Sequence, residues 1–366
     1  MTNEYISVGL MSGTSGDGVD VSIIQSDGEK NYISILDEYF KYNDDIFSSI
    51  HNLKEKINSK KELTKYSDEL KDLEKKITFF HAKVVNKILE KNKHKIDLLG
   101  FHGQTIFHNS KDKITKQLGD GGLLSQLTKK NVIFNFRQND IKQGGEGAPL
   151  VPIFHKLIEK KLKIKPVTFI NIGGITNITS ISGDDKFYAT DVGPGMCLID
   201  QWVRSQTKKK YDHDGTLAKS GKVNKIILDQ VLENFFYLKK EKKQQSFDVK
   251  DFDPSFIRGL SLEDGAATLT EFTLKLILEY LNIDQKKNNN IILCGGGRKN
   301  NFLIDRMKQN NLLPELIDTH GINGDFVESQ AFAYLAIRSF LKKPISFPET
   351  TGVSFPCVGG ELIEFI

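Results

Sequence analysis

Two glycine-containing turns, each flanked by short apolar segments, constrain the fold of this 366-residue chain more than any other feature. The first turn covers residues 13–18, between expected strands at 5–10 and 21–24. The second covers residues 173–174, between expected strands at 167–172 and 179–182. A strand, a glycine-rich turn and a second strand form a hairpin. The repetition of this unit predicts two similar domains that face a shared site.

The remaining pattern predicts an α/β fold with mixed sheets. Apolar residues recur at helical spacing in residues 44–94, which predicts two or three amphipathic helices. Further strands are expected at 96–101, 131–136, 187–190 and 291–294, and helices at 194–205, 266–281 and 326–341. The length of the chain favours two domains with a ligand-binding cleft between them. We expect one domain at 1–140 plus 345–366 and another at 141–344.

Composition excludes several classes of function. The net charge is only +4, and no lysine run is interleaved with aromatic residues, which argues against nucleic-acid binding. Cys197, Cys294 and Cys357 lie far apart and form no C-x-x-C pair, so neither a disulfide framework nor a structural zinc site is expected. The sequence shows no signal peptide and no apolar run long enough to span a bilayer. We therefore expect a cytoplasmic protein.

The first turn is a candidate anion site. The phosphate-loop motif G-x-x-x-x-G-K-[ST] and the protein-kinase motifs are absent from the sequence. Residues 11–20, MSGTSGDGVD, instead supply glycines for close backbone approach, hydroxyl donors, and two carboxylates, Asp17 and Asp20, able to hold Mg²⁺ through water. The alternative is a tight hairpin turn that needs positive φ.

Two polar segments are candidates for substrate contact. Residues 101–108 place His102, Gln104 and Thr105 at the end of a strand, where α/β proteins commonly bind ligands. The sequence places no third metal ligand beside the histidines, so a structural or sugar-contacting role is favoured. Arg137 lies beside a glycine loop at 144–147 and could receive a substrate carboxylate. A surface pair with an aspartate is the alternative for Arg137.

The second half of the chain contains three further candidates. Gly173 and Gly174 form either a second phosphate contact or an ordinary hairpin turn. Asp191 lies at the end of an expected strand before a helix, where it is either a helix cap or a general base. Gly295, Gly296 and Gly297 follow another strand and either let the backbone pass against a flat or phosphorylated ligand or form a packing turn.

In this order, the segments closely resemble the anhydro-N-acetylmuramic acid kinase family, within the superfamily that contains actin, hexokinase and the heat-shock chaperone ATPases. The resemblance extends over nearly the whole chain. Its most specific segments are residues 11–20, 101–108, 136–155, 171–178, 190–200 with Trp202, 211–218, 293–300 and 324–328. The sequence departs from the family pattern at Met196, where asparagine is usual, and at Ser329-Gln330, which replaces a more alanine-rich context.

The resemblance implies a two-domain actin-like (ribonuclease H-like) ATPase fold with mixed sheets and a central interdomain cleft. It implies ATP and Mg²⁺ as cofactors, Asp191 as the catalytic aspartate, and a role for Glu328 in positioning water, sugar or Mg²⁺. An acid that is simply favourable in a helix's first turn is the alternative for Glu328. A homodimer is also implied. The expected ATP-binding residues are Gly13, Thr14, Ser15, Gly16, Asp17, Gly18, Val19, Asp20, Gly173, Gly174, Gly295, Gly296 and Gly297.

The reaction implied by the resemblance opens the 1,6-anhydro ring of anhydro-N-acetylmuramic acid and phosphorylates O6, in peptidoglycan recycling. Closure of the cleft is then expected, to exclude bulk water. Two alternatives remain open. One is a kinase for another 1,6-anhydro sugar, and the other is a non-catalytic actin-like protein whose partner affinity is switched by nucleotide.

Overall fold

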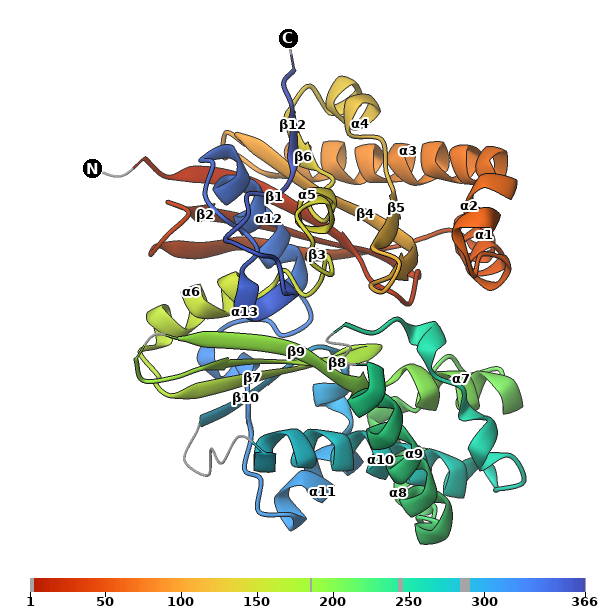
Figure 1. The fold of residues 1–366 in the computed structure, drawn as a ribbon. Helices are drawn as coiled ribbons and strands as arrows, with labels where there is room; N and C mark the ends of the chain where they lie inside the picture. Colours follow the sequence, from red (N-terminus) through yellow and green to blue (C-terminus); the bar gives the residue numbers. More distant parts are fainter. Residues whose placement is uncertain (1–2, 185, 243–245, 284–289, 366) are drawn as a thin grey trace. The chain divides into compact units, whose positions relative to one another are not determined.

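The computed structural model describes residues 3–184, 186–242, 246–283 and 290–365. The chain forms two compact units, shown in Figure 1. The first unit consists of residues 1–163 and 326–366, and the second of residues 164–325. Each unit contains one mixed β-sheet with helices packed on it.

The sheet of the first unit has seven strands within the described ranges, in the order β12-β6-β4-β1-β2-β3, with β5 paired to β4. Strands β1, β2 and β3 are antiparallel neighbours, whereas β4 and β6 run parallel to β1. The bounds are β1 (Tyr5–Ser12), β2 (Gly18–Ser26), β3 (Tyr32–Lys41), β4 (Leu98–Asn109), β5 (Ile114–Leu118), β6 (Asn131–Phe134) and β12 (Glu361–Ile363).

The sheet of the second unit has five strands among the described residues, in the order β11-β10-β7-β8-β9. Strands β7, β8 and β9 are antiparallel, and β10 and β11 run parallel to β7. The bounds are β7 (Val167–Ile172), β8 (Ile175–Ile181), β9 (Phe187–Pro194), β10 (Asn290–Cys294) and β11 (Glu315–Leu316).

The two sheets share one topology. In each, an antiparallel meander of three strands is followed by two strands parallel to the first, so that β1, β2, β3, β4 and β6 correspond to β7, β8, β9, β10 and β11. The two glycine turns therefore occupy the same topological position, between the first and second strands of each sheet. The expected α/β fold with mixed sheets is confirmed, and each unit contains one copy of the repeated strand order.

The helices follow the apolar periodicity closely. Residues 44–94 form three helices, where two or three were predicted. Asn43 caps the first helix, because its side chain accepts a hydrogen bond from the Ile46 N–H. The first unit contains α1 (Asp44–Lys56), α2 (Lys60–Lys65), α3 (Ser67–Lys91), α4 (Gly121–Thr128), α5 (Gln138–Lys142), α6 (Pro152–Leu162), α12 (Val327–Phe340) and α13 (Pro348–Thr351). The second contains α7 (Cys197–Gln206), α8 (Thr216–Ser220), α9 (Lys225–Lys242), α10 (Leu262–Ile283) and α11 (Asn301–Gln309). No helix in the described part of the chain is long and apolar enough to cross a membrane.

The unit boundaries differ from the predicted domains. Residues 141–163 and 326–344 were expected in the second domain, but the structure has them in the first unit. The reason is the packing of two helices. Helix α12 packs on β1, β2 and β4, and α6 packs on α12. Sequence position alone gives no sign of these contacts.

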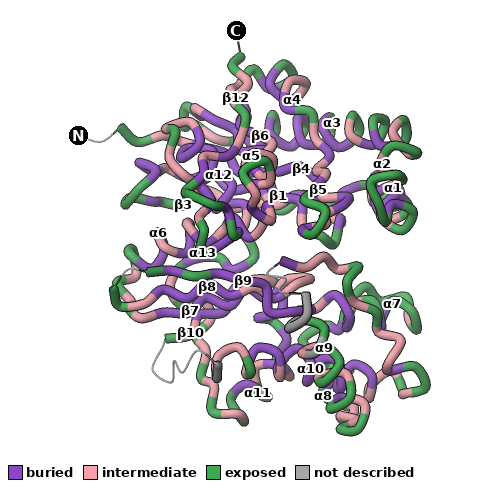
Figure 2. The backbone as a smooth tube through the Cα atoms, viewed as in Figure 1, coloured by how far each residue is buried: buried purple, intermediate pink, exposed green. Residues whose placement is uncertain are grey.

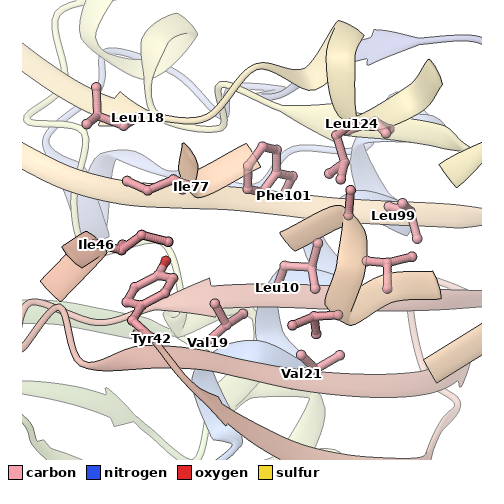
Figure 3. Close-up of a cluster of buried hydrophobic side chains, with 14 of the residues drawn as sticks. Leu10, Val19, Val21, Tyr42, Ile46, Ile77, Leu99, Phe101, Leu118 and Leu124 are labelled. Carbon is pink, nitrogen blue, oxygen red and sulfur yellow. The ribbon is translucent and has the colours of Figure 1, made fainter. Parts of the chain in front are cut away.

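The core of the first unit lies between its sheet and helices α1 and α3. Figure 3 shows its buried side chains, and Figure 2 shows that buried residues follow the central strands of both sheets and α12. Leu10 and Phe101 come from β1 and β4, while Ile46 and Ile77 come from α1 and α3. All four side chains lie in one cluster of buried residues. Helix α1 contacts α3 and β4 in this packing.

Two adjacent glycines allow α12 to approach the other face of the sheet. Gly9 of β1 and Gly100 of β4 are register partners in neighbouring strands. A Cβ atom on Gly9 would lie 1.9 Å from the Ser329 carbonyl oxygen, and one on Gly100 would lie 2.3 Å from the Phe332 carbonyl oxygen. Any side chain at either position would therefore displace the helix.

Candidate functional site

The first glycine turn joins β1 to β2 and has exposed backbone at its tip. The Gly16 N–H donates to the Gly13 carbonyl over 3.1 Å, and Gly16 has φ +62°, in the region that favours glycine. Thr14 and Ser15 are exposed. The alternative of a hairpin turn with positive φ thus describes the local backbone correctly, and Thr14 and Ser15 at its tip are open to solvent.

Residues far away in the sequence brace this turn. Gln104 Nε2 donates to the Gly13 carbonyl over 2.9 Å, and Lys54 Nζ of α1 donates to the Thr14 carbonyl over 2.7 Å. The Tyr42 N–H donates to the Asp17 carbonyl over 2.9 Å. Three residues therefore hold the turn by hydrogen bonds, and Lys54 places a positive charge beside it. Sequence reasoning missed Lys54 and Tyr42, since nothing local links them to the turn.

The two acidic residues of the turn have different surroundings. The Asp17 carboxylate accepts hydrogen bonds from Ser15 Oγ and from Tyr39 OH, the latter at 3.1 Å. Asp20 lies on β2, opposite Met11 and Tyr39. Burial, and then the charges of Asp17 and Asp20, raise the pKa of Tyr39, so its hydroxyl stays protonated and able to donate.

Magnesium fits this donor set only together with oxygens from a ligand. Within the described residues, no group of three or more His, Cys, Asp or Glu side chains could hold a metal ion. Mg²⁺ is commonly bound through one or two carboxylates plus phosphate oxygens and waters. Asp17 and Asp20 supply that number of carboxylates beside the exposed turn.

A buried network lies beneath the turn. Ser12 Oγ is 2.8 Å from Tyr42 OH and 3.4 Å from His81 Nε2. His81 Nδ1 lies 2.8 Å from the Ile77 carbonyl, which only accepts, so Nδ1 carries the proton and Nε2 accepts from Ser12. Burial lowers the pKa of His81 to about 4. The neutral imidazole therefore fixes the end of β1 just before the turn.

His102 and Arg137 are brought together in the first unit. His102 Nε2 accepts hydrogen bonds from Arg137 Nε at 3.1 Å and Nη2 at 3.0 Å, while its Nδ1 donates to the Gly103 carbonyl. Arg137 Nη1 donates to the Gly147 carbonyl over 2.7 Å. Burial, followed by the charge of Arg137, holds the pKa of His102 well below its usual value. A neutral His102 thus orients the guanidinium, and its ring lies against Phe332 with centroids 4.5 Å apart and the ring planes tilted by 49°.

The segment containing Gln104 and Thr105 differs from its prediction. It was expected at the end of a strand, but β4 continues to Asn109 and pairs with β5. Thr105 Oγ1 accepts from Gln117 Nε2 of β5 at 3.2 Å. Gln104 is opposite Ser12 in the register with β1, which explains how it reaches the turn. The added pairing with β5, the next strand along the chain, extends β4 beyond its predicted end.

In the second unit, the glycine turn of β7–β8 meets the start of α7. The Gly195 N–H donates to the Gly174 carbonyl over 2.9 Å, and the Met196 N–H donates to the Gly173 carbonyl over 2.8 Å. Met196 is the N-cap of α7 and makes no side-chain capping bond. Asp191 therefore does not cap this helix, which removes that alternative.

Asp191 lies within β9 and is 6% exposed. Its Oδ2 accepts a hydrogen bond from the Phe247 N–H over 2.8 Å. Its register partner is Asn177 of β8. A carboxylate held at one oxygen by a backbone N–H has a defined orientation, which a general base requires.

The Gly295–Gly297 segment leads from β10 into a short 3₁₀ turn, Gly296–Lys299. Cβ atoms on Gly295 and Gly297 would lie 2.5 Å from Asn171 Oδ1 and 2.3 Å from Ile172 Cγ2, so these two glycines serve packing against β7. A Cβ on Gly296 would meet no atom within 4 Å. The segment therefore satisfies the packing alternative at two positions and leaves Gly296 open to a ligand.

Arg298 anchors this segment and was not singled out from the sequence. Its guanidinium is 4% exposed and forms ion pairs with Asp318 at 2.6 Å and with Asp325 at 2.7 Å. It also donates to the Gly295 carbonyl over 3.0 Å. Its place directly after three glycines was the available signal, since a flexible loop needs an anchor to hold one conformation.

Glu328 is the second residue of α12 and is half-buried. An acid in a helix's first turn is favourable there, so this alternative holds whatever else Glu328 does.

The predicted site residues are divided between the two units. Those of the first unit are residues 13–20, His102, Gln104, Thr105, Arg137 and Glu328. Those of the second are Gly173, Gly174, Asp191 and Gly295–Gly297.

Comparison with known proteins places the chain in a family. A profile of the family described as "Anhydro-N-acetylmuramic acid kinase" matches residues 4–364. The chain is 52% identical over 374 residues to the anhydro-N-acetylmuramic acid kinase of Pelagibacter ubique, with 100% of both chains covered. It is 37% identical to that of Zymomonas mobilis, covering 98% of this chain and 99% of the relative. Because these similarities extend along the whole sequence, the chain belongs to the anhydro-N-acetylmuramic acid kinase family.

Proposed function

We propose that the chain is an ATP-dependent kinase that opens the 1,6-anhydro ring of anhydro-N-acetylmuramic acid by hydrolysis and phosphorylates O6, in peptidoglycan recycling. The observation that carries the proposal is the family match over residues 4–364. The actin-like fold supports it, since the duplicated topology places a glycine turn in each unit. The products are N-acetylmuramic acid 6-phosphate and ADP.

The reaction needs a base for water rather than for a sugar hydroxyl. In the substrate, O6 is bonded to C1 and has no proton to lose. A water molecule attacks C1, the C1–O6 bond breaks, and O6 attacks the γ-phosphorus of ATP as ADP leaves. One proton of the water passes to the base, and the other stays on the new C1 hydroxyl.

Asp191 is the proposed base. Its burial and the hydrogen bond from the Phe247 N–H to Oδ2 support this role, because both restrict how the carboxylate can turn. Glu328 is proposed to position the water or the sugar. Asp191 lies on β9 and Glu328 lies on α12.

ATP is proposed to bind at the glycine segments of both units. The exposed tip of the residue 13–18 turn offers backbone N–H groups, and the ammonium of Lys54 adds a positive charge beside it. Gly296 offers open space for the nucleoside part. Asp17 and Asp20 would hold Mg²⁺, which when bound neutralises charge on the phosphates.

Arg137 is proposed to hold the lactyl carboxylate of the sugar. A guanidinium suits a carboxylate because two N–H groups can point at two oxygens. His102 supports this role by keeping Arg137 in place through Nε2. Gln104 and Thr105 complete the proposed substrate-binding set.

Isotope labelling tests the reaction. The protein is mixed with Mg-ATP and 1,6-anhydro-N-acetylmuramic acid in ¹⁸O-labelled water, and the product is analysed by mass spectrometry. We expect the label at C1 and the phosphate at O6. A phosphorylated sugar without label would disprove the hydrolytic step, and the absence of any sugar product would favour the nucleotide-switch alternative.

The role of Asp191 is tested by Asp191→Asn. We expect turnover to fall by about 10²- to 10⁴-fold while ATP binding is largely kept, because the amide cannot accept the proton of water. Asp229→Asn on the exposed face of α9 is the matched control. An Asp191→Asn protein with near-normal turnover would exclude Asp191 as the base.

Substrate identity is tested by the lactyl group. Replacing Arg137 with Ala should raise the KM for anhydro-N-acetylmuramic acid but leave the KM for 1,6-anhydro-N-acetylglucosamine, which lacks the lactyl carboxylate, unchanged. Equal effects on both sugars would favour a kinase for another anhydro sugar.

We also propose, from the family resemblance, that the protein is a cytoplasmic homodimer. Light scattering on the purified protein checks the dimer.

A further inference from the structure

A buried polar cluster lies directly behind Glu328. The next two residues of α12, Ser329 and Gln330, are both 0% exposed. Buried polar side chains are costly unless they form hydrogen bonds. The hydrogen-bond partners of Ser329 and Gln330 therefore show what these two side chains do.

Gln330 is bound at both ends of its amide. Nε2 lies 3.0 Å from Asp37 Oδ1 and 2.9 Å from Asp37 Oδ2, and it donates to both oxygens of this β3 carboxylate. The amide oxygen of Gln330 accepts from Tyr32 OH. Burial, and then the charge of Asp37, raise the pKa of Tyr32, which keeps this phenol a donor.

Ser329 connects the same helical turn to β2. Its hydroxyl lies 2.6 Å from Ser22 Oγ, and Ser22 Oγ donates to Asp37 Oδ1 over 2.6 Å. Because a carboxylate only accepts, the Ser22 proton points to Asp37. The Ser329 hydroxyl then has two acceptors within reach, Ser22 Oγ at 2.6 Å and the Phe326 carbonyl of its own helix at 3.0 Å. Asp37 is thus the common acceptor for both arms of the cluster.

The backbone of this turn is constrained independently. The Ser329 carbonyl passes over Gly9, where a Cβ atom would lie only 1.9 Å away. The close approach sets the distance of α12 from the sheet. The hydrogen bonds to Asp37 and Ser22 set the rotation of the helix about its axis, since a turn of the helix would pull both side chains from their partners.

We propose that Asp37, Ser22, Ser329 and Gln330 form a clamp that positions the Glu328 carboxylate. Glu328 precedes the clamped residues directly, so the direction in which its side chain leaves the helix follows from the rotation of this turn. The four residues are positioning residues and do not touch the substrate. The proposal rests on the role proposed for Glu328 in the kinase reaction.

An exchange of charges tests the clamp. Gln330→Glu places a carboxylate against Asp37 and should lower kcat by about 10- to 100-fold, since small displacements of catalytic groups cost this much. KM for ATP should change little. Adding Asp37→Asn should restore kcat, because the new Asn amide can donate to Glu at position 330 while Tyr32 and Ser22 still donate as before.

Two further measurements separate positioning from stability. Hydrogen exchange of the peptide covering residues 326–331 should rise in Gln330→Glu and return to the wild-type rate in the double variant. In a Glu328→Gln background, Gln330→Glu should cause little additional loss of kcat, because the group that it misplaces is already gone.

The outcomes are distinguishable. A Gln330→Glu protein with a lower melting temperature but wild-type kcat, or a full additional loss in the Glu328→Gln background, would overturn the clamp as a positioning device. If wild-type protein forms no phosphorylated sugar, the proposed function fails before the clamp is tested. If Glu328→Gln retains normal kcat while the sugar is phosphorylated, the kinase function stands and the clamp inference fails.

Discussion

Acidification should destabilise the first unit more than the second, because the first contains buried neutral histidines. Burial lowers the pKa of His81 to about 4 and that of His155 to about 3, and their side chains are at most 1% exposed. In the unfolded chain a histidine has a pKa of about 6.5. Between these pKa values the histidines bind protons in the unfolded state but not in the folded state. The free energy of unfolding therefore falls as the pH falls.

The expected magnitude follows from this difference. At about pH 5.5, a histidine that stays neutral in the folded state costs roughly 1.4 kcal/mol relative to about pH 7.5. His81 and His155 together cost about 3 kcal/mol, a large part of the 5 to 15 kcal/mol typical of a domain. His102 acts in the same direction, since burial and Arg137 also lower its pKa. The stability contributed by these neutral histidines is fully present above the unfolded pKa and is lost as the pH falls toward the folded pKa.

Hydrogen exchange measured by mass spectrometry checks this prediction unit by unit. Peptides of strands β1 and β4 should lose protection between the two pH values, after correction for intrinsic exchange, by more than peptides of β7 and β8. Trp202, the single tryptophan, lies in the second unit. Its fluorescence during urea unfolding therefore gives an independent measure of that unit.

Single substitutions make the test quantitative. His155→Gln should reduce the difference in unfolding free energy between the two pH values by roughly 1.4 kcal/mol, whatever constant cost the substitution carries. His94→Gln at an exposed position is the control. Equal acid sensitivity in both units, or the same pH dependence in His155→Gln as in wild type, would refute the reasoning.

Three further perturbations have defined outcomes. Gly100→Ala should lower the free energy of unfolding by about 1 to 3 kcal/mol in urea titrations, because its Cβ would lie 2.3 Å from a carbonyl oxygen of α12, whereas Gly183→Ala, with no atom within 4 Å, should not. Lys54→Met should weaken ATP binding in calorimetry by about three- to tenfold through loss of a charge beside the turn, and the same affinity as wild type would argue against phosphates at this turn. Arg298→Lys should raise the KM for ATP, since lysine cannot reproduce the paired contact with Asp318.

Features with a local cause were predictable from the sequence. The two glycine turns, the three helices of residues 44–94 and the strands flanking each turn depend on periodicity and on glycine, which act over a few residues. The structure confirms them and adds that both turns lie at the same place in one repeated strand order. Element ends were less predictable. Strand β4 extends to Asn109 because it pairs with β5, and pairing depends on the partner strand.

Features that depend on distant partners were not predictable. Lys54 reaches Thr14, Gln330 reaches Asp37, and both contacts join residues on separate elements. Nothing in the spacing of either residue indicates its partner. The polar pair Ser329-Gln330 was visible in the sequence, but its hydrogen bonding could be known only from the position of Asp37 on β3.

The structure gives His102, a residue singled out from the sequence, a more specific role than the sequence indicated. His102 was expected to contact the sugar or to have a structural role. In the structure its two ring nitrogens hydrogen-bond to Arg137 and to the Gly103 carbonyl. Because the lowered pKa keeps its ring neutral, Nε2 remains an acceptor for the guanidinium. A charged imidazole would repel Arg137 and free it to turn. The neutral ring therefore holds the arginine in one orientation, which is also what recognition of a carboxylate requires.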